Sequence, residues 1–269
     1  MMTGCRHKFS PCLAALVLAW GPGTAVAQDD RSLFDIASAG VTYGPYVRLE
    51  LGYGNADIGD AYWKPRGATD PQVFFDLNAD KTPYGSLSFG FDWMNGFRSD
   101  LSIASFGTKS VSGGWSYTSP PTPGPHADIA TEVESLTMMA NLYYSPLEQM
   151  GRNQRFQPYL TAGIGVAQNT MGDWTRSNPA SPRPTKTYEG NSQTDAAWTV
   201  GIGAAWRVFD YDARPVMLDA SLRYFDLGEA KGSSVPKMGS GSSQPREPIQ
   251  FKIQSTVFAV GLRVPLQRY

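Results

Sequence analysis

The stretch YVRLELGYG, residues 46–54, decides the fold because its two faces differ in chemical character. In a β-strand, successive side chains point to opposite faces. Leu49 and Leu51 share one face, whereas Arg48 and Glu50 share the other. A soluble sheet would turn the apolar face to a core, but a transmembrane barrel would turn it to lipid and place the charges inside. The pattern of the remaining sequence distinguishes between these two interpretations.

Seven further stretches show a similar alternation, and none of the chain reads convincingly as an amphipathic helix. Each stretch is close to the length, about nine to eleven residues, that crosses a bilayer at a tilt. They span residues 85–93, 97–106, 135–144, 156–167, 197–208, 216–227 and 251–266.

The connections between these stretches alternate strictly between short and long. The short ones are 94–96, 146–155 and 209–215, and the long ones, rich in Pro, Gly, Ser and Asn, are 56–84, 107–131, 168–195 and 228–248. Outer-membrane barrels have short periplasmic turns and long extracellular loops, whereas a compact soluble domain rarely contains four structureless loops of this length. The sequence therefore predicts an all-β fold, an eight-stranded antiparallel up-and-down transmembrane β-barrel with four long extracellular loops, rather than a lipocalin-like soluble barrel.

The N-terminus has the three parts of a secretion signal. Arg6 and Lys8 precede the short apolar run LAALVLAW at 13–20, and the tripeptide Ala-Val-Ala at 25–27 fits the cleavage site. Cys5 and Cys12 both lie in this segment, so we expect no disulfide in the mature chain. The predicted organisation is a signal peptide at 1–27, a short periplasmic segment at 28–44 and an outer-membrane barrel at 45–269.

The charge balance of the mature chain argues against a nucleic-acid partner. Residues 28–269 contain 21 basic and 24 acidic residues, which lacks the basic field of a nucleic-acid binder. Neither Gly163-Ile164-Gly165 nor Gly201-Ile202-Gly203 continues to the third glycine of a dinucleotide loop. We expect a monomer without cofactor or metal, in contact with outer-membrane lipid and lipopolysaccharide.

Five segments resemble the opacity-type outer-membrane β-barrel family, and they occur in the expected order. They are GPYVRLELGYG (44–54), MMANLYYSP (138–146), RFQPYLTAGIGVA (155–167), AWTVGIGAAWRV (197–208) and LRYFDLG (222–228). Members of that family resemble the eight-stranded OmpA membrane domain. The resemblance implies residence in the bacterial outer membrane and a surface role such as adhesion or envelope integrity, without a shared catalytic site.

Nine charged residues fall on the faces predicted to point inward. The interior of an eight-stranded barrel is just wide enough for side chains to fill, and buried charges have to be paired and hydrogen-bonded. We therefore expect ion pairs that plug the barrel rather than an ion-conducting pore, with Asp92 contacting Arg98, and Arg207 either contacting Asp219 or lying one pair away. The nine residues are Arg48, Glu50, Asp92, Arg98, Asp100, Arg207, Asp219, Arg223 and Arg263.

The long loops carry the residues most typical of binding interfaces, aromatics and Arg, and rigid scaffolds concentrate function in such loops. We predict exposed contacts for host or cell-surface ligands at Tyr62, Trp63, Lys64, Arg66, Trp115, Tyr117, Trp174, Arg176 and Tyr188.

Three alternatives stay open. The loops merely cover the barrel mouth, the barrel is a narrow channel or a conduit for hydrophobic small molecules, or it is a lipid A-modifying enzyme that uses His126 with Ser135. The proline-rich segment around His126 is a poor way to hold a base within reach of a nucleophile. We therefore expect no catalytic activity.

Overall fold

The computed structural model describes residues 44–93, 95–123, 127–150, 155–178, 184–211 and 214–266. The predicted signal peptide and residues 28–43 of the predicted periplasmic segment lie outside these ranges. The described part contains eleven strands and one short helix: β1 Pro45–Lys64, β2 Gln72–Ala79, β3 Thr82–Asp92, β4 Phe97–Ser119, β5 Asp128–Tyr144, α1 Pro146–Gln149, β6 Phe156–Met171, β7 Trp174–Ser177, β8 Lys186–Tyr188, β9 Asn191–Tyr211, β10 Arg214–Lys231 and β11 Glu247–Pro265.

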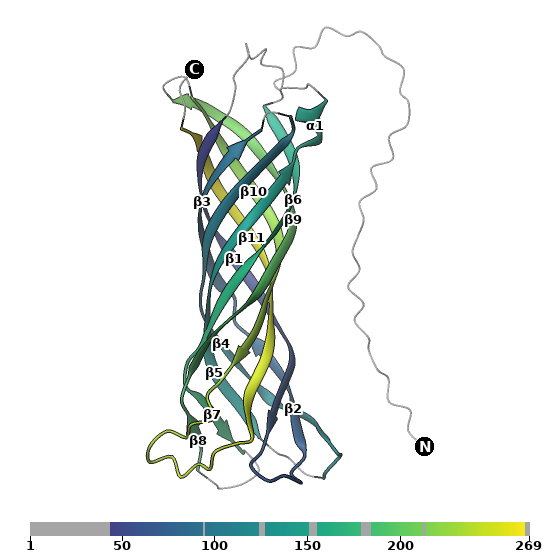
Figure 1. Cartoon of the computed structure of the whole chain (residues 1–269), viewed down its shortest axis with the longest axis vertical. Coiled ribbons are helices and arrows are strands. Elements are labelled where there is room, and N and C mark those ends of the chain that lie inside the picture. The colour runs from purple at the N-terminus through teal and green to yellow at the C-terminus, as the bar shows by residue number, and fades with distance from the viewer. Residues whose placement is uncertain are drawn as a thin grey trace, which may run out of the picture. The chain divides into compact units, whose positions relative to one another are not determined.

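Eight of these strands close into an antiparallel ring (Figure 1). Chain neighbours pair around the ring from β1 through β3, β4, β5, β6, β9, β10 and β11. The last strand returns to the first, in a ladder from Tyr46↔Pro265 to Lys64↔Glu247. The predicted eight-stranded up-and-down β-barrel is therefore confirmed.

The two ends of the barrel differ. The short connections, including α1, gather at one end, which we call the turn end, and β2, β7 and β8 lie at the other, which we call the loop end (Figure 1). Among the residues that the structure describes, no helix is long and apolar enough to cross a membrane.

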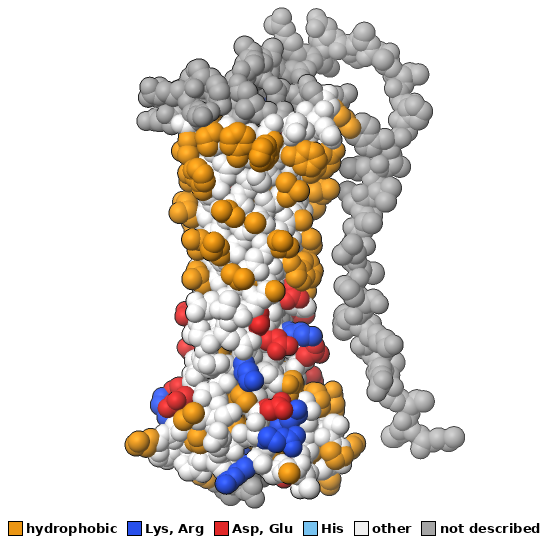
Figure 2. All heavy atoms as spheres, in the orientation of Figure 1, with side chains coloured by type: hydrophobic (Ala, Val, Ile, Leu, Met, Phe, Trp, Pro, Cys, Tyr) orange, Lys and Arg blue, Asp and Glu red, His pale blue; other side chains and the backbone are white. Residues whose placement is uncertain are grey.

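The half of the barrel toward the turn end has an apolar outer surface, which we call the lipid band (Figure 2). In the opening stretch, Leu51 is 67 % exposed, whereas Arg48 and Glu50 are each 1 % exposed. The band continues on every strand of the ring, with the exposed side chains Leu49, Leu87, Phe89, Leu101, Ile103, Leu136, Met138, Leu142, Leu160, Ile164, Val200, Ile202, Leu222, Phe258 and Leu262. The stretch thus turns its apolar face outward, as the barrel interpretation predicts.

Beyond the lipid band the strands continue toward the loop end, in a part that we call the extension. Here the pattern inverts: Val111, Val133 and Phe251 are buried, and charged side chains lie on the outside (Figure 2). The four long connections predicted at 56–84, 107–131, 168–195 and 228–248 are therefore only partly loops, because each also contributes residues to strands. An extended hairpin satisfies its own backbone hydrogen bonds, and an inward apolar row gives it a water-excluding core.

A bulge in β1 sets which residues of the extension face inward. Up to Ile58, the even-numbered residues of β1 point inward, as Arg48 does. After it, the odd-numbered residues Ala61 and Trp63 are the buried ones. The change occurs at Asp60, which has a positive φ of 51° and interrupts the β1–β11 register. An extra residue in one strand reverses the alternation after it. Trp63 owes its inward position to this bulge.

Inward glycines make room for large interior side chains. A Cβ at Gly203 would lie 2.4 Å from the Tyr159 ring, and one at Gly90 would lie 2.5 Å from the Tyr46 ring. Both tyrosines are buried inside the barrel. The narrow interior is therefore packed by rings that lie against bare backbone.

Candidate functional site

The barrel interior within the lipid band holds two groups of charged residues. In the first, Arg48 lies 3.1 Å from Asp100 and 3.5 Å from Glu50, and Arg223 pairs with the same Glu50. Ser86 donates to Glu50 at 2.9 Å, and the side-chain amide of Asn141 donates to Asp100 at 2.7 Å. Partners of opposite sign and neutral donors together offset the cost of burying these charges.

The second group is centred on Arg263, which lies 3.3 Å from Asp92 and 3.4 Å from Asp219. Asp92 is opposite Arg98 in the β3–β4 ladder, and it also lies close to Arg263 of β11, which is separated from β3 only by β1. Arg207 is half-buried and opposite Met217, two ladder positions from the Asp219↔Ala205 pair, so it is not directly opposite Asp219.

Arg98 relies on aromatic rings in addition to its neighbour in the ladder. Its guanidinium lies 5.0 Å from the Tyr143 ring centroid and 4.8 Å from that of Tyr159. The negative face of an aromatic ring attracts a cation, most strongly when both are shielded from water. This part of the interior thus holds its buried charges against partners of opposite sign and against aromatic rings.

The interior of the extension is apolar instead. Its buried side chains form one cluster, which we call the outer core, and which includes Trp63, Val73, Phe75, Leu77, Phe106, Val111, Ile129, Val133, Met171, Trp174, Tyr188, Ile249, Phe251 and Ile253. Lys109 is a cation buried at this level: it is 2 % exposed, lies opposite Val133, and has its pKa lowered to about 8 by burial.

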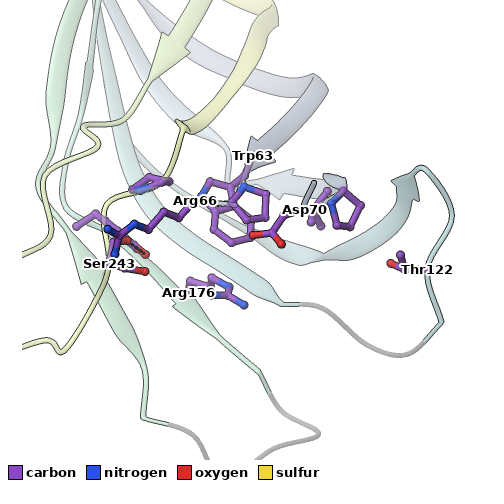
Figure 3. A pocket seen from close by; sticks show the side chains of 11 residues that line it. Trp63, Arg66, Asp70, Thr122, Arg176 and Ser243 are labelled. Carbon is purple, nitrogen blue, oxygen red and sulfur yellow. Dashed lines mark hydrogen bonds between the residues drawn. The ribbon is translucent and has the colours of Figure 1, made fainter. Parts of the chain in front are cut away.

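A cavity of about 380 Å³ lies at the loop end, and Figure 3 shows the side chains that line it. We call it the mouth cavity. It is bounded by strand ends and by connections that are far apart in the sequence, and its lining is Trp63, Pro65, Arg66, Asp70, Pro71, Val73, Thr122, Arg176, Tyr188, Ser243 and Pro245. Four of the nine predicted contact residues, Trp63, Arg66, Arg176 and Tyr188, therefore meet at one place.

The lining residues are held by contacts with one another. The Arg176 guanidinium lies 4.6 Å from the Trp63 ring centroid, and Tyr188 stacks on Trp174 at 4.0 Å and 11°. The Tyr188 hydroxyl donates to the Ser243 carbonyl at 3.3 Å. Burial raises the pKa of the Tyr188 phenol, and the charge of Arg176 partly opposes this effect.

Two features of the cavity lining have unused capacity for a ligand. The indole nitrogen of Trp63 is buried without a hydrogen-bond partner. Arg66 is exposed at the rim, and the described residues provide it with no recorded ion pair. A buried polar group without a partner is uncommon in native proteins and calls for an explanation.

The other predicted contacts lie elsewhere in the extension. Tyr62 and Tyr117 flank Phe74, which stacks on Tyr117 at 4.4 Å, and Lys64 lies 5.5 Å from the Tyr62 ring centroid. Trp115 is half-buried beside the outer core. Of the nine residues predicted to be exposed, only Arg66 and Tyr117 are fully exposed, and four are half-buried. The prediction is wrong for Trp63, Trp174 and Tyr188, which are 5 %, 0 % and 1 % exposed as parts of the outer core.

Sequence reasoning did not single out Phe74, Asp70, Thr122 or Ser243. Phe74 lies inside the predicted long loop 56–84, although its neighbours Val73 and Phe75 alternate with it as in a strand. The other three are ordinary polar residues of connections, and only the fold brings them to the cavity. His126 lies outside the described residues, so the structure gives no position for that candidate base.

One interruption in the barrel wall lies just beyond the lipid band. β1 pairs with β3 as far as Gly54↔Thr82 and with β2 from Tyr62↔Phe74, and each strand advances eight residues between these pairs, so the register is unchanged. No ladder pair is recorded between 55–61 and 75–81, all of which are described. A cleft of about 410 Å³ follows this wall seam, lined in part by Asp57, Asn78 and Gln254.

The family follows from a match that covers most of the chain. Residues 15–261 match the family model of the outer membrane protein β-barrel domain. The chain belongs to this family. Its strand ring and lipid band agree with that membership, which places the protein in the bacterial outer membrane.

Solved structures with the same kind of barrel are distant in sequence. Neisserial surface protein A (NspA) is 16 % identical, with 83 % of this chain and 97 % of that chain covered and a TM-score of 0.43. OprG from Pseudomonas aeruginosa is 14 % identical, with 82 % and 95 % covered and a TM-score of 0.43. Ail from Yersinia pestis is 12 % identical, with 82 % and 99 % covered and a TM-score of 0.33. No curated protein matches the chain.

Proposed function

We propose that the protein is a surface-recognition barrel, in which the lipid band anchors the chain and the extension presents a ligand-binding mouth to the outside of the cell. The supporting observation is the meeting of Trp63, Arg66, Arg176 and Tyr188 around one cavity at the loop end. Long connections of outer-membrane barrels face the exterior, so the mouth cavity is accessible to host or cell-surface ligands. This role is adhesion-like and needs no chemistry.

The filled interior favours recognition over conduction. A permeating ion would have to displace the paired charges around Arg48 and Arg263 and also pass the apolar side chains of the outer core. Removing one partner from a buried ion pair typically costs about 3–5 kcal/mol, so such displacement is unfavourable. A large steady conductance in planar bilayers would contradict the proposal.

The test compares attachment of bacteria that display the wild type with bacteria that display a shortened barrel. Residues 65–71 and 232–246, which flank the mouth cavity, are replaced by short Gly/Ser turns. We expect normal membrane insertion, seen as heat-modifiable migration, and loss of attachment to cells and matrix. Gln149→Ala at the turn end is the control and should leave attachment intact. Unchanged attachment of the shortened barrel would favour a purely structural envelope role.

A second candidate function is lateral passage of small apolar molecules, and the wall seam is the observation that favours it. Asp57 and Ala79 are opposite each other across the seam if the register is continued. A disulfide between Asp57→Cys and Ala79→Cys would close it. Under this candidate, uptake of an apolar fluorescent dye stops on oxidation and returns on reduction. If dye uptake is the same with and without the disulfide, lateral passage through the wall seam is wrong.

We also propose that the protein is not an enzyme. The lipid A-modifying alternative depends on His126, and an assay of lipid A hydrolysis with the wild type and His126→Ala tests it directly. Turnover that disappears in the variant would reverse this part of the proposal.

A further inference from the structure

We infer that the mouth cavity binds a terminal acidic sugar, that is, a carboxylate-bearing monosaccharide unit at the end of a surface glycan. This inference rests on the proposed function and names the ligand class of the same site. It follows from three properties of the cavity: its charge, an unused buried donor, and the chemistry of its walls.

The charge of the cavity favours an anion. Arg66 and Arg176 contribute two positive charges, and Asp70 contributes one negative charge. Asp70 is already engaged by its own turn, because its carboxylate accepts from the Gly67 N–H at 2.8 Å. The planar guanidinium group matches a carboxylate through two parallel hydrogen bonds. A ligand carboxylate at the rim would therefore form an ion pair with Arg66 and neutralise its charge.

The Trp63 indole provides a second, independent signal. Trp63 is 5 % exposed, lines the cavity, and has no acceptor for its N–H. The Arg176 guanidinium covers the face of the same ring, so the donor and a cation lie side by side. An oxygen-rich ligand would satisfy the indole N–H while its negative charge meets the cation.

The walls fit a small polyhydroxylated body. Pro65, Pro71 and Pro245 limit the backbone freedom of the rim, and Trp63 and Tyr188 supply rigid rings. Ser243 adds a hydroxyl group that can exchange hydrogen bonds with sugar hydroxyls, whereas the Thr122 hydroxyl is hydrogen-bonded to that of Thr118 at 3.0 Å. The volume of about 380 Å³ is at the small end of ligand pockets, which suits one sugar unit rather than a chain.

The test measures binding to the full chain in lipid nanodiscs by calorimetry. The probes are N-acetylneuraminic acid and glucuronic acid, with their uncharged methyl esters, neutral galactose, benzoate and inorganic sulfate as comparisons. We expect saturable binding of at least one acidic sugar and clearly weaker binding of its methyl ester. Equal binding of acid and ester, binding of benzoate or sulfate as tight as that of the acidic sugars, or no binding of either acidic sugar would overturn the inference.

Variants locate the binding. Trp63→Phe keeps an aromatic ring but removes the indole N–H, and a hydrogen bond to a charged acceptor is worth enough that we expect affinity to fall about ten-fold or more. Arg66→Gln should weaken binding of the acid but not of its ester. Trp198→Phe makes the same indole change in the lipid band, where Trp198 is exposed to lipid, and should have no effect. If Trp63→Phe and Arg66→Gln both bind like the wild type, the ligand is elsewhere and the inference is wrong.

The two proposals fail in different ways. If acidic sugars bind at the mouth but attachment survives the shortened barrel, then the adhesion-like role is wrong and the ligand class stands. If attachment is lost in Trp63→Phe and Arg66→Gln but neither acidic sugar binds, then the role stands and the ligand class is wrong.

Discussion

Lys109 should make the barrel less stable near neutral pH than an apolar residue would. The ordinary pKa of a lysine is 10.5, and burial among the side chains of the outer core lowers that of Lys109 to about 8. One pKa unit corresponds to about 1.4 kcal/mol, so the charged amine lowers the free energy of unfolding by about 3 kcal/mol. Lys109→Met keeps the length of the side chain and removes this cost.

The direction in which stability changes with pH follows from the two pKa values of Lys109. Between pH 8 and 10.5 the unfolded chain holds a proton at this position that the folded barrel has lost, so wild-type stability rises with pH through this window. Below pH 8 both states are charged and the full cost remains. The advantage of Lys109→Met should therefore be about 3 kcal/mol at pH 7 and should shrink toward zero above pH 10.

Urea unfolding of the two proteins in liposomes, followed from pH 7 to pH 10.5, measures this difference. Taking the difference between variants cancels the titration of the tyrosines that both share. Lys81→Met, at an exposed position, is the control and should change stability by less than about 0.5 kcal/mol at every pH. An advantage of Lys109→Met that is absent, or that does not depend on pH, would refute the reasoning.

Three further predictions concern the plug, the interior packing and the orientation. Arg263→Met removes the cation that lies 3.3 Å from Asp92 and 3.4 Å from Asp219, and urea unfolding should show a loss of stability of about 3–5 kcal/mol. Lys231→Ala should have little effect, and an equal effect of the two substitutions would contradict the plug. Gly203→Ala places a methyl group against Tyr159 and should lower the free energy of unfolding by about 1–3 kcal/mol. Gly59→Ala, where a Cβ would meet open space, should lower it by less. A larger loss in Gly59→Ala than in Gly203→Ala would contradict this packing. Protease added to intact cells should cut within 65–71 or 232–246, and cleavage confined to the turn end would show that the orientation is inverted.

The sequence predicted the membrane-embedded half of the barrel well because its signal is local. Leu49 and Arg48 alternate in a way that only a strand with two different environments explains, and the length of each such run matches a bilayer. The extension was missed because its apolar rows, such as Val73, Phe75 and Leu77, lie among Pro, Gly and Asp residues that also mark loops. Pairing partners such as β4 decide between strand and loop, and they are distant in the chain.

The candidate site was predicted as residue types and not as a place. Aromatics and Arg pointed to Trp63, Arg66, Arg176 and Tyr188, but which of the nine candidates meet at a cavity depends on the bulge at Asp60 and on the β7–β8 hairpin. The sequence has the same limit for the interior charges. The alternation within its own strand predicts that Asp219 points inward, but its ion pair with Arg263 is a contact with the neighbouring strand.

By itself, therefore, the sequence determined the all-β class, the number of strands in the ring and the face that meets lipid, because hydrophobic alternation and connection length are properties of contiguous residues. Only the tertiary structure decided the length of the extension, the outer core around Lys109, the partners of Arg263 and the gathering of the mouth cavity. These features depend on the closure of the ring, which brings side chains from opposite ends of the chain within contact distance and excludes water from between them.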